Sequence, residues 1–224
     1  MSTIAIHQPQ YLPWLPYFQK ISDADHFVLL DNVQYDKRGL QNRNQIKGPN
    51  GPLWLTVPVH ASIDRRISSV RVADQKWQEK HKRSIKQCYA KAAHIELYEK
   101  LLEPILSNEY EFLVDLNIAI IQIFLDFLEI RTNIIKASSL NAKGRKEELM
   151  INICKELNAT RYLSGTGARE YQSDIQFKEQ GIQLEYHVSE IPDYKQCHMK
   201  NGFEKGMSIV DMILNLGADT RPLL

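Results

Sequence analysis

Cysteine is scarce in this sequence, and its three cysteines are far apart in the chain, without a CxxC pair: Cys88, Cys154 and Cys197. A disulfide framework and a cysteine zinc site are therefore not expected, and a reducing cytoplasm suits such a chain. The histidines are scattered without the spacing of metal ligands, so no metal site is predicted. Walker, GxGxxG and GxSxG motifs are also missing, which removes the commonest nucleotide and serine-hydrolase patterns.

Charge of one sign and long apolar runs are missing too. The 28 basic and 27 acidic residues give a net charge of +1, so no specific nucleic-acid partner is predicted. The most apolar stretch, FLVDLNIAIIQIFLDFLEI at 112–130, is interrupted by acids and amides at helical spacing, which favours a buried helix over a membrane span. The first residues lack the basic and apolar regions of a signal peptide. We expect a cytoplasmic protein without membrane insertion.

Short apolar strands alternate with amphipathic helices near both ends of the chain. TIAIH and HFVLLD flank a helix that begins with two prolines, and NIIKA, RYLSG and IQLEY alternate with further helices. Strands separated by helices of ~10–15 residues are typical of right-handed βαβ units and a parallel sheet. The sequence therefore predicts an α/β fold with a Rossmann-like, nucleotide-binding-type parallel sheet.

One domain is expected to span residues 1–224. Its parts are a core sheet from about 1–31 and 132–187, a mixed, mostly helical insertion at about 54–129, and a C-terminal helix at about 207–217. Residues 32–53 are predicted to form a long polar loop, and WLTVPV and ISSVRVA a pair of strands.

The loop after the first strand, IHQPQYLPWLPYF, is unusually rich in aromatic and amide groups. Ligands of such sheets bind at the carboxyl ends of the strands, where the strand order reverses. The aromatic residues of this loop could stack on a flat or sugar-like ligand while its other polar residues supply hydrogen bonds: Tyr11, Trp14 and Tyr17, with His7, Gln8 and Gln10. The alternative is that the aromatics belong to the core and the prolines only shape a turn.

A second glycine-rich loop, SGTGAR, joins a predicted strand to a helix. Its glycines allow close approach of a ligand to the backbone, its hydroxyls can donate hydrogen bonds, and its arginine can bind an anion: Ser164, Gly165, Thr166, Gly167 and Arg169. The two loops are predicted to face one pocket. Alone, a short turn with two glycines is often only a turn.

Two more segments offer polar groups at the same predicted edge. KGRKEEL places basic residues, including Lys146, where a helix begins, although a solvated helix start explains most such charges. The segment DNVQYDKRGLQNRNQIK is either a binding loop or ordinary surface, and its candidate binding residues are Asp31, Gln34, Arg38, Asn42 and Arg43.

Six segments together resemble the WbqC-like protein family: IHQPQYLPWLPYFQKI, FVLLDNVQY, NRNQIK, WLTVPV, LSGTGAREY and SIVDMILNLG. The resemblance implies a bacterial protein associated with O-antigen and other surface-polysaccharide synthesis. Some family members are proposed to attach an amino acid, such as glycine, to an amino sugar. The chain departs from the usual family pattern at Pro16, where glycine is common, and in the second loop at Thr166, Ala168, Glu170 and Gln172.

A more distant similarity connects PWLPYFQKISDAD with the HxGH segment of nucleotidylyltransferase-type enzymes, including pantothenate synthetase. Such enzymes join a carboxylate to an amine through an acyl-adenylate. Here Trp14 and Tyr17 occupy the two histidine positions and Pro16 that of the glycine. Stabilisation of phosphate charge would therefore fall to basic residues elsewhere: Arg38, Arg43, Lys146 or Arg169.

Two functions are open at this point. The first is an enzyme, a transferase or AMP-forming ligase, that acylates the amine of a nucleotide-linked amino sugar, with ATP and Mg²⁺ as candidate cosubstrates and His7 as general base. For His7, a strand-end histidine bonded to backbone is the equal alternative. The second is a non-catalytic protein that binds a nucleotide or nucleotide-sugar and regulates or scaffolds glycan assembly. In either case the partner is a small molecule: a nucleotide, nucleotide-sugar or amino acid.

Overall fold

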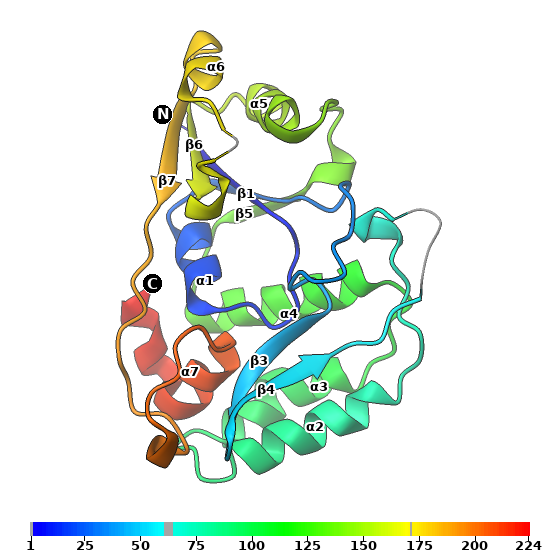
Figure 1. Cartoon of the computed structure of the whole chain (residues 1–224), viewed down its shortest axis with the longest axis vertical. Helices are drawn as coiled ribbons and strands as arrows, with labels where there is room; N and C mark the ends of the chain where they lie inside the picture. The colour runs from blue at the N-terminus through cyan, green and yellow to red at the C-terminus, as the bar shows by residue number, and fades with distance from the viewer. Residues whose placement is uncertain (1, 61–64, 171) are drawn as a thin grey trace.

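A computed structural model describes residues 2–60, 65–170 and 172–224, and its central element is a five-stranded sheet (Figure 1). The strand order is β5-β2-β1-β6-β7, and every neighbouring pair is parallel. The strands are β1 (Thr3–His7), β2 (His26–Leu29), β5 (Asn133–Lys136), β6 (Arg161–Gly165) and β7 (Gln183–His187). The predicted α/β fold with a parallel sheet is confirmed, and it is compatible with a Rossmann-like fold.

Apolar residues cover both faces of this sheet, as a parallel sheet requires. In β1, Ile4 and Ile6 point to one face and pack with α5 (Lys146–Glu156) and α6 (Asp174–Glu179). Ala5 belongs to the larger cluster on the other face. That cluster draws on α1 (Leu15–Ser22), α2 (Trp77–Cys88), α4 (Leu113–Leu128) and α7 (Ile209–Leu216). The odd-numbered positions of β1, including His7, therefore face α1.

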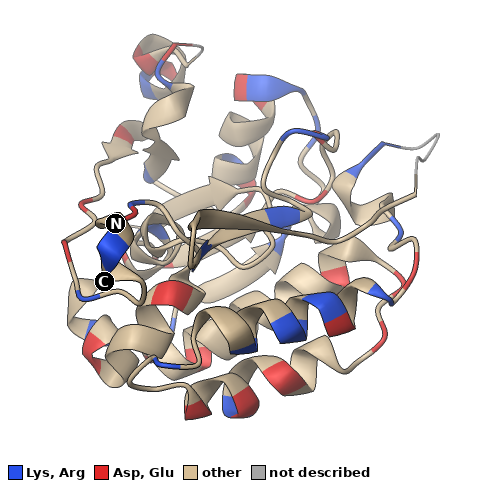
Figure 2. Cartoon of the chain, turned by 60° about the horizontal axis from the view of Figure 1, so that its bottom comes forward, with Lys and Arg blue, Asp and Glu red and all other residues tan. Residues whose placement is uncertain are grey.

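The apolar stretch at 112–130 forms α4, which packs in the core. Its acids and amide at positions 115, 122 and 126 are exposed in a polar stripe, and Glu129 ends the helix with a φ of 61°. Among the residues that the structure describes, no helix combines the length and apolarity needed to cross a bilayer. Figure 2 shows basic and acidic residues interspersed over the helices around the sheet.

The prediction for residues 32–73 is wrong in two respects. Part of the expected polar loop is β3 (Arg43–Gly48), which pairs antiparallel with β4 (Gly51–Thr56). ISSVRVA is not the partner of β4: Ile67–Ser69 is a 3₁₀ turn, and a bridge joins Val59 to Val72. The polar residues of β3 made this segment look like a loop in the sequence. Asn44 and Lys47 are nevertheless buried in the strand, because both make hydrogen bonds there.

The other helices differ from the predicted ones mainly at their ends. Within the stretch expected to be mostly helical, a π-helical turn (Tyr98–Leu102) is followed by α3 (Glu103–Leu106). Of the helix expected after SGTG, Asp174–Glu179 is α-helical, and Tyr171 lies outside the described residues. α7 begins as expected, because the Ser208 hydroxyl accepts a hydrogen bond from the Val210 amide.

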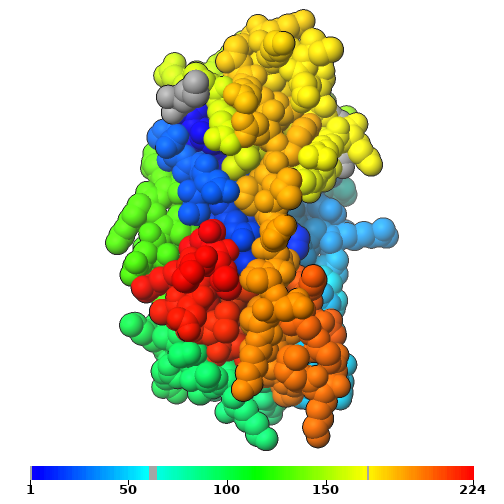
Figure 3. All heavy atoms as spheres, turned by 90° about the vertical axis from the view of Figure 1, so that its left-hand side faces the viewer, coloured from blue at the N-terminus to red at the C-terminus, as the bar shows by residue number. Residues whose placement is uncertain are grey.

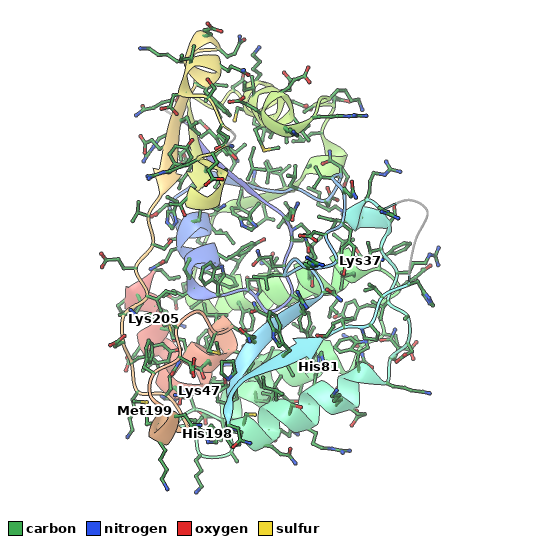
Figure 4. The ribbon with its side chains drawn as sticks, viewed as in Figure 1. Lys37, Lys47, His81, His198, Met199 and Lys205 are labelled. Atoms are coloured by element: carbon green, nitrogen blue, oxygen red, sulfur yellow. The ribbon has the colours of Figure 1, made fainter. Side chains whose placement is uncertain are left out.

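The segment 188–208 returns from β7 toward β3 and α2 and lies along one side of the molecule, beside α7 (orange and red in Figure 3). Buried polar bonds anchor it. Lys47 Nζ donates to Gln196 Oε1 at 3.0 Å, and the Asp211 carboxylate accepts from Gln196 and Tyr194 at 2.9 and 2.5 Å. Figure 4 labels Lys47 near His198, whose ring Nε2 donates to the Cys88 carbonyl at 2.7 Å. These contacts join the C-terminal segment to β3 and α2.

Candidate functional site

The carboxyl ends of the five strands form one edge of the sheet, and two cavities lie along it. Strand order reverses between β1 and β6, because β2 and β5 lie on one side of β1 and β6 and β7 on the other. A cavity of about 280 Å³ opens at this switch point. A larger one of about 850 Å³ lies beyond the ends of β2 and β5. We name them the switch-point cavity and the β2–β5 cavity.

The switch-point cavity is lined by both loops that the sequence singled out. Trp14 and Tyr17 come from the first loop and α1, and Gly165 and Thr166 from the second loop. The remaining lining residues are His7, Pro16, Lys20, His187, Val188, Ser189 and Ile191. Both loops therefore face the same space, at the position where ligands bind in related sheets.

His7 ends β1 at the wall of this cavity. Its Nδ1 lies 3.1 Å from the Gln8 carbonyl, and its ring meets the edge of Tyr17 at 5.0 Å between centroids. A carbonyl can only accept, so Nδ1 carries the proton and Nε2 is the free acceptor. Burial, aided by the nearby Lys20 charge, lowers the pKa of His7 to about 3. The imidazole is therefore neutral near pH 7, and it is a weak base.

Lys20, which the sequence did not single out, supplies an amine at the same cavity. The side chain is only 4% exposed, and Nζ donates to the Ile6 carbonyl at 3.3 Å. Among the described residues, no carboxylate forms an ion pair with it. Burial lowers the pKa of Lys20 from 10.5 to about 7. Its position three residues after Tyr17, on the buried face of α1, was the available signal.

A chain of hydrogen bonds crosses the rim of the cavity. The Ser189 hydroxyl lies 2.8 Å from His187 Nδ1, and His187 Nε2 lies 3.0 Å from Asp23 Oδ2. Burial lowers the pKa of His187 despite the opposing effect of the Asp23 carboxylate. The neutral ring therefore donates from Nε2 to Asp23 and accepts from Ser189, which fixes Ser189 at the cavity edge.

Several predicted residues of the first loop are packed inside the protein. The Tyr11 ring is fully buried, and its hydroxyl lies 2.8 Å from His81 Nδ1. Gln8 accepts through Oε1 from Gln41 Nε2 at 2.5 Å, and its backbone carbonyl accepts from the Tyr17 hydroxyl at 3.2 Å. Gln10 retains a buried Oε1 without a partner among the described residues. The bonds of Tyr11 and Gln8 therefore tie the loop to His81, Gln41 and Tyr17.

Of the residues predicted from the polar segment, some line a cavity and others do not. The Asn42 amide donates to the Val57 carbonyl at 2.9 Å, which ties the segment to the end of β4. Arg43 stacks on Trp54 at 4.7 Å and donates to the Arg38 carbonyl at 2.8 Å. None of these three residues lines either cavity along the edge. Gln34 does line the β2–β5 cavity, together with Lys146.

Only part of the second loop lines the switch-point cavity. Ser164 is buried, and its hydroxyl donates to Gln172 Oε1 at 2.7 Å. The Arg169 guanidinium stacks on Tyr186 at 4.9 Å, outside the residues that line either cavity. Gly167 is exposed, and a side chain there would meet no heavy atom within 4 Å. Gly165 and Thr166 alone reach the switch-point cavity.

A metal centre has no cluster to hold it within the described part of the chain, where no three His, Cys, Asp or Glu residues are suitably grouped. The class defined so far is an α/β protein with a parallel sheet and two cavities at its carboxyl edge. Comparison with known families matches residues 8–222 to the WbqC-like protein family. The chain therefore belongs to the WbqC-like family.

A relative of nearly the same length carries no functional description in its name. The chain is similar to the uncharacterized protein Rv1507c of Mycobacterium tuberculosis, with 33% identity over 223 residues. The match covers 98% of this chain and 96% of that protein. Residue roles must therefore be argued from the site itself.

Proposed function

We propose that this WbqC-like protein is an enzyme of bacterial surface-polysaccharide assembly. It transfers an acyl group, such as an aminoacyl group, to the amine of a nucleotide-linked amino sugar. The observation that carries the proposal is a buried amine, Lys20, beside a neutral imidazole, His7, in the switch-point cavity. The polysaccharide context is what the resemblance to the WbqC-like family implies.

The chemistry requires a proton acceptor. When an amine attacks an acyl carbonyl, its nitrogen becomes positively charged and must lose a proton before the amide is stable. A general base works best when its pKa lies near the working pH. Lys20, with a pKa of about 7, fits this condition, whereas His7, with a pKa of about 3, is too weak a base. The proton-accepting role is thus assigned to Lys20, and His7 becomes a neutral hydrogen-bonding group.

The acyl donor must reach the cavity in an activated form, either as an adenylate made from ATP or on a carrier. The positions that hold histidines in nucleotidylyltransferases do not supply imidazole here. The Tyr17 hydroxyl donates a hydrogen bond to the Gln8 carbonyl, and Trp14 offers an apolar ring whose only donor is one N–H. Adenylate formation would therefore depend on cations outside this loop.

A non-catalytic nucleotide-sugar binder is the second candidate, and the same observation favours it. A site without the phosphate-stabilising histidines can bind a ligand that it does not convert. The two candidates differ in turnover and agree in binding.

The test is an acyl-transfer assay on the full chain. Purified protein is incubated with nucleotide-linked amino sugars and either amino acids plus ATP or acyl carriers, and mass spectrometry follows the amide product. AMP and pyrophosphate are measured in parallel. Lys20→Met should abolish product, whereas Lys155→Met, an exposed lysine on α5, should not. Binding of a nucleotide-sugar by wild type without product under any donor would instead establish the non-catalytic binder.

A further inference from the structure

Hydrogen bonds within the protein fix the walls of the β2–β5 cavity. Asp31 is 2% exposed and accepts from the Ser138 amide at 2.8 Å and the Ser138 hydroxyl at 2.6 Å. Its backbone carbonyl accepts from the Ser68 amide at 2.8 Å. Asp31 thus joins the end of β2 to the segment after β5 through its carboxylate, and to the 3₁₀ turn at Ile67–Ser69 through its backbone carbonyl. Asp31, predicted as a ligand contact, acts here as a positioning residue.

Basic residues gather on one side of this cavity. Lys143, Arg145 and Lys146 line it, and no acid belongs to its described lining. None of the three forms an ion pair within the described chain. Two acids lie on the same helix: Glu147 accepts from the Ser173 amide at 2.5 Å, and the Glu148 side chain packs against Gly144. Three cations without an ion-pair partner among the described residues therefore face about 850 Å³ of space.

The backbone adds to this positive field. α5 begins at Lys146, and no side chain caps its first amides. Free amides and the helix dipole both favour an anion at such an end. Basic side chains at a helix start oppose the dipole, so an anion between them would remove that conflict. Lys146 also has a φ of 51°, a conformation that residues other than glycine seldom adopt.

Asn32 also lines the cavity, and one of its side-chain atoms has no hydrogen-bond partner among the described residues. Asn32 Nδ2 donates to the Ala137 carbonyl at 3.4 Å, which fixes the amide orientation. Its Oδ1 is buried and has no hydrogen-bond partner among the described residues. That oxygen has almost no accessible surface, so a ligand meets the rest of the Asn32 side chain, which lines the cavity.

We propose that the β2–β5 cavity binds the diphosphate and adjoining sugar of a nucleotide or nucleotide-sugar. The phosphates lie against Lys143, Arg145 and Lys146, and the sugar lies beside the Asn32 side chain. The cavity volume suits a ligand of this size. As an identification of a substrate subsite, the inference rests on the proposed acyl transfer. It also separates the nucleotide site from the reaction centre at Lys20.

The diphosphate could belong to ATP or to a nucleotide-sugar, and calorimetry on the full chain distinguishes them. The probes are inorganic pyrophosphate, ATP, UDP and UDP-N-acetylglucosamine. At least one nucleotide should bind wild type, more weakly as salt increases. A triple variant (Lys143→Gln, Arg145→Gln, Lys146→Gln) should lose about tenfold or more per charge-assisted contact removed. The matched control, Lys155→Gln, removes an exposed lysine from the other end of α5 and should bind like wild type.

Asn32→Ala gives a second, independent readout. It should weaken nucleotide binding by roughly three- to tenfold and leave pyrophosphate binding unchanged, because only the nucleotide carries the sugar that lies beside Asn32. Unfolding curves of every variant identify any loss of fold. If the triple variant does not fold, the comparison of nucleotide and pyrophosphate binding in Asn32→Ala still tests the proposal.

The outcomes separate this inference from the proposed function. Wild-type affinity in the triple variant, or no binding of any probe by wild type, would overturn the inference. Loss of nucleotide binding in Thr166→Val, a residue of the other cavity, with none in the triple variant, would move the ligand to the switch point and also overturn it. Binding that depends on the basic residues, without acyl transfer, would support the inference while the proposed function fails.

Discussion

Lys20 Nζ donates to the carbonyl oxygen of Ile6, 3.3 Å away, on the strand that ends one residue later at His7. A lysine on the first helix is thereby held against the carboxyl end of the central strand. Burial without a carboxylate partner destabilises its charged form, which is why its pKa is about 7. Such strongly perturbed groups in cavities often belong to functional sites.

The first prediction concerns the pH dependence of acyl transfer. If Lys20 is the base, kcat/KM should fall as the pH drops below about 7, because the amine is then protonated and cannot accept a proton. Lys20→Arg, which stays charged, should lower kcat by ~10²–10⁴ and remove that limb from any residual activity. A pH–rate profile of the purified variant measures this. An unchanged limb in Lys20→Arg would show that another group titrates.

The second prediction concerns stability. The pKa of Lys20 is about 7 in the folded chain and 10.5 as a free side chain, so the unfolded chain binds more protons between these values. Stability therefore rises with pH across this window. Lys20→Met removes this dependence and should be more stable than wild type at pH 7. The difference should shrink toward pH 10.5, by on the order of 3–5 kcal/mol over the window.

Urea unfolding of both proteins between pH 7 and 10 measures that difference. The buried tyrosines also titrate at high pH, but they are present in both chains and cancel in the comparison. A pH-independent difference would show that Lys20 is charged normally in the folded protein.

The third prediction separates His7 from Lys20. His7→Asn keeps a side-chain amide that can donate to the Gln8 carbonyl, so the loop should remain folded. The variant should lose turnover through altered positioning yet keep the pH limb near 7, since the pKa of His7 is about 3. The measurement is the same pH–rate profile. Loss of that limb in His7→Asn would return the base role to the imidazole.

Sequence patterns predicted the sheet well because its signal is local. Each strand is a short apolar run, and each crossover helix repeats apolar residues at three and four positions, so neither depends on distant partners. β3 was missed because RNQIKG looks polar in sequence. Its Asn44 and Lys47 are buried only because distant carbonyl and amide groups accept their hydrogen bonds, those of Leu12, Gln196 and Gly202.

The site was harder to predict for a related reason. Topology placed His7, Trp14 and Tyr17 opposite Gly165 and Thr166 correctly in space, as the switch-point rule indicates. Whether a side chain faces the cavity or the core depends on packing that one sequence does not reveal. Tyr11 and Lys20 illustrate this: the aromatic residue is buried on His81, and the lysine of an apolar helix face lines the cavity.

The fourth prediction concerns Arg169, which the sequence suggested as an anion ligand. Its guanidinium stacks on Tyr186, and the residue lines neither cavity. Arg169→Ala should therefore leave nucleotide affinity within about twofold and change stability by less than about 1 kcal/mol, the range of exposed cation–π contacts. Calorimetry and urea unfolding measure the two quantities. A large loss of affinity with an intact fold would mean that Arg169 swings toward the ligand.

The last prediction concerns the anchor of the C-terminal segment. Asp211 is buried and accepts from Tyr89, Tyr194 and Gln196 at 2.7, 2.5 and 2.9 Å. Asp211→Asn replaces one acceptor oxygen by an NH₂ donor, so at least one of these donors loses its partner. Leaving a buried hydrogen-bonding group unpaired costs about 1–3 kcal/mol.

The free energy of unfolding of Asp211→Asn should therefore fall by about that amount in urea. Tyr194→Phe is the matched control, since it removes one donor and leaves the carboxylate two others. In the double variant the two losses should be less than additive, because both residues belong to one hydrogen-bonded network. Additive losses would show that Asp211 and Tyr194 stabilise the segment independently, and that the carboxylate is not the point at which 188–208 is held to the core.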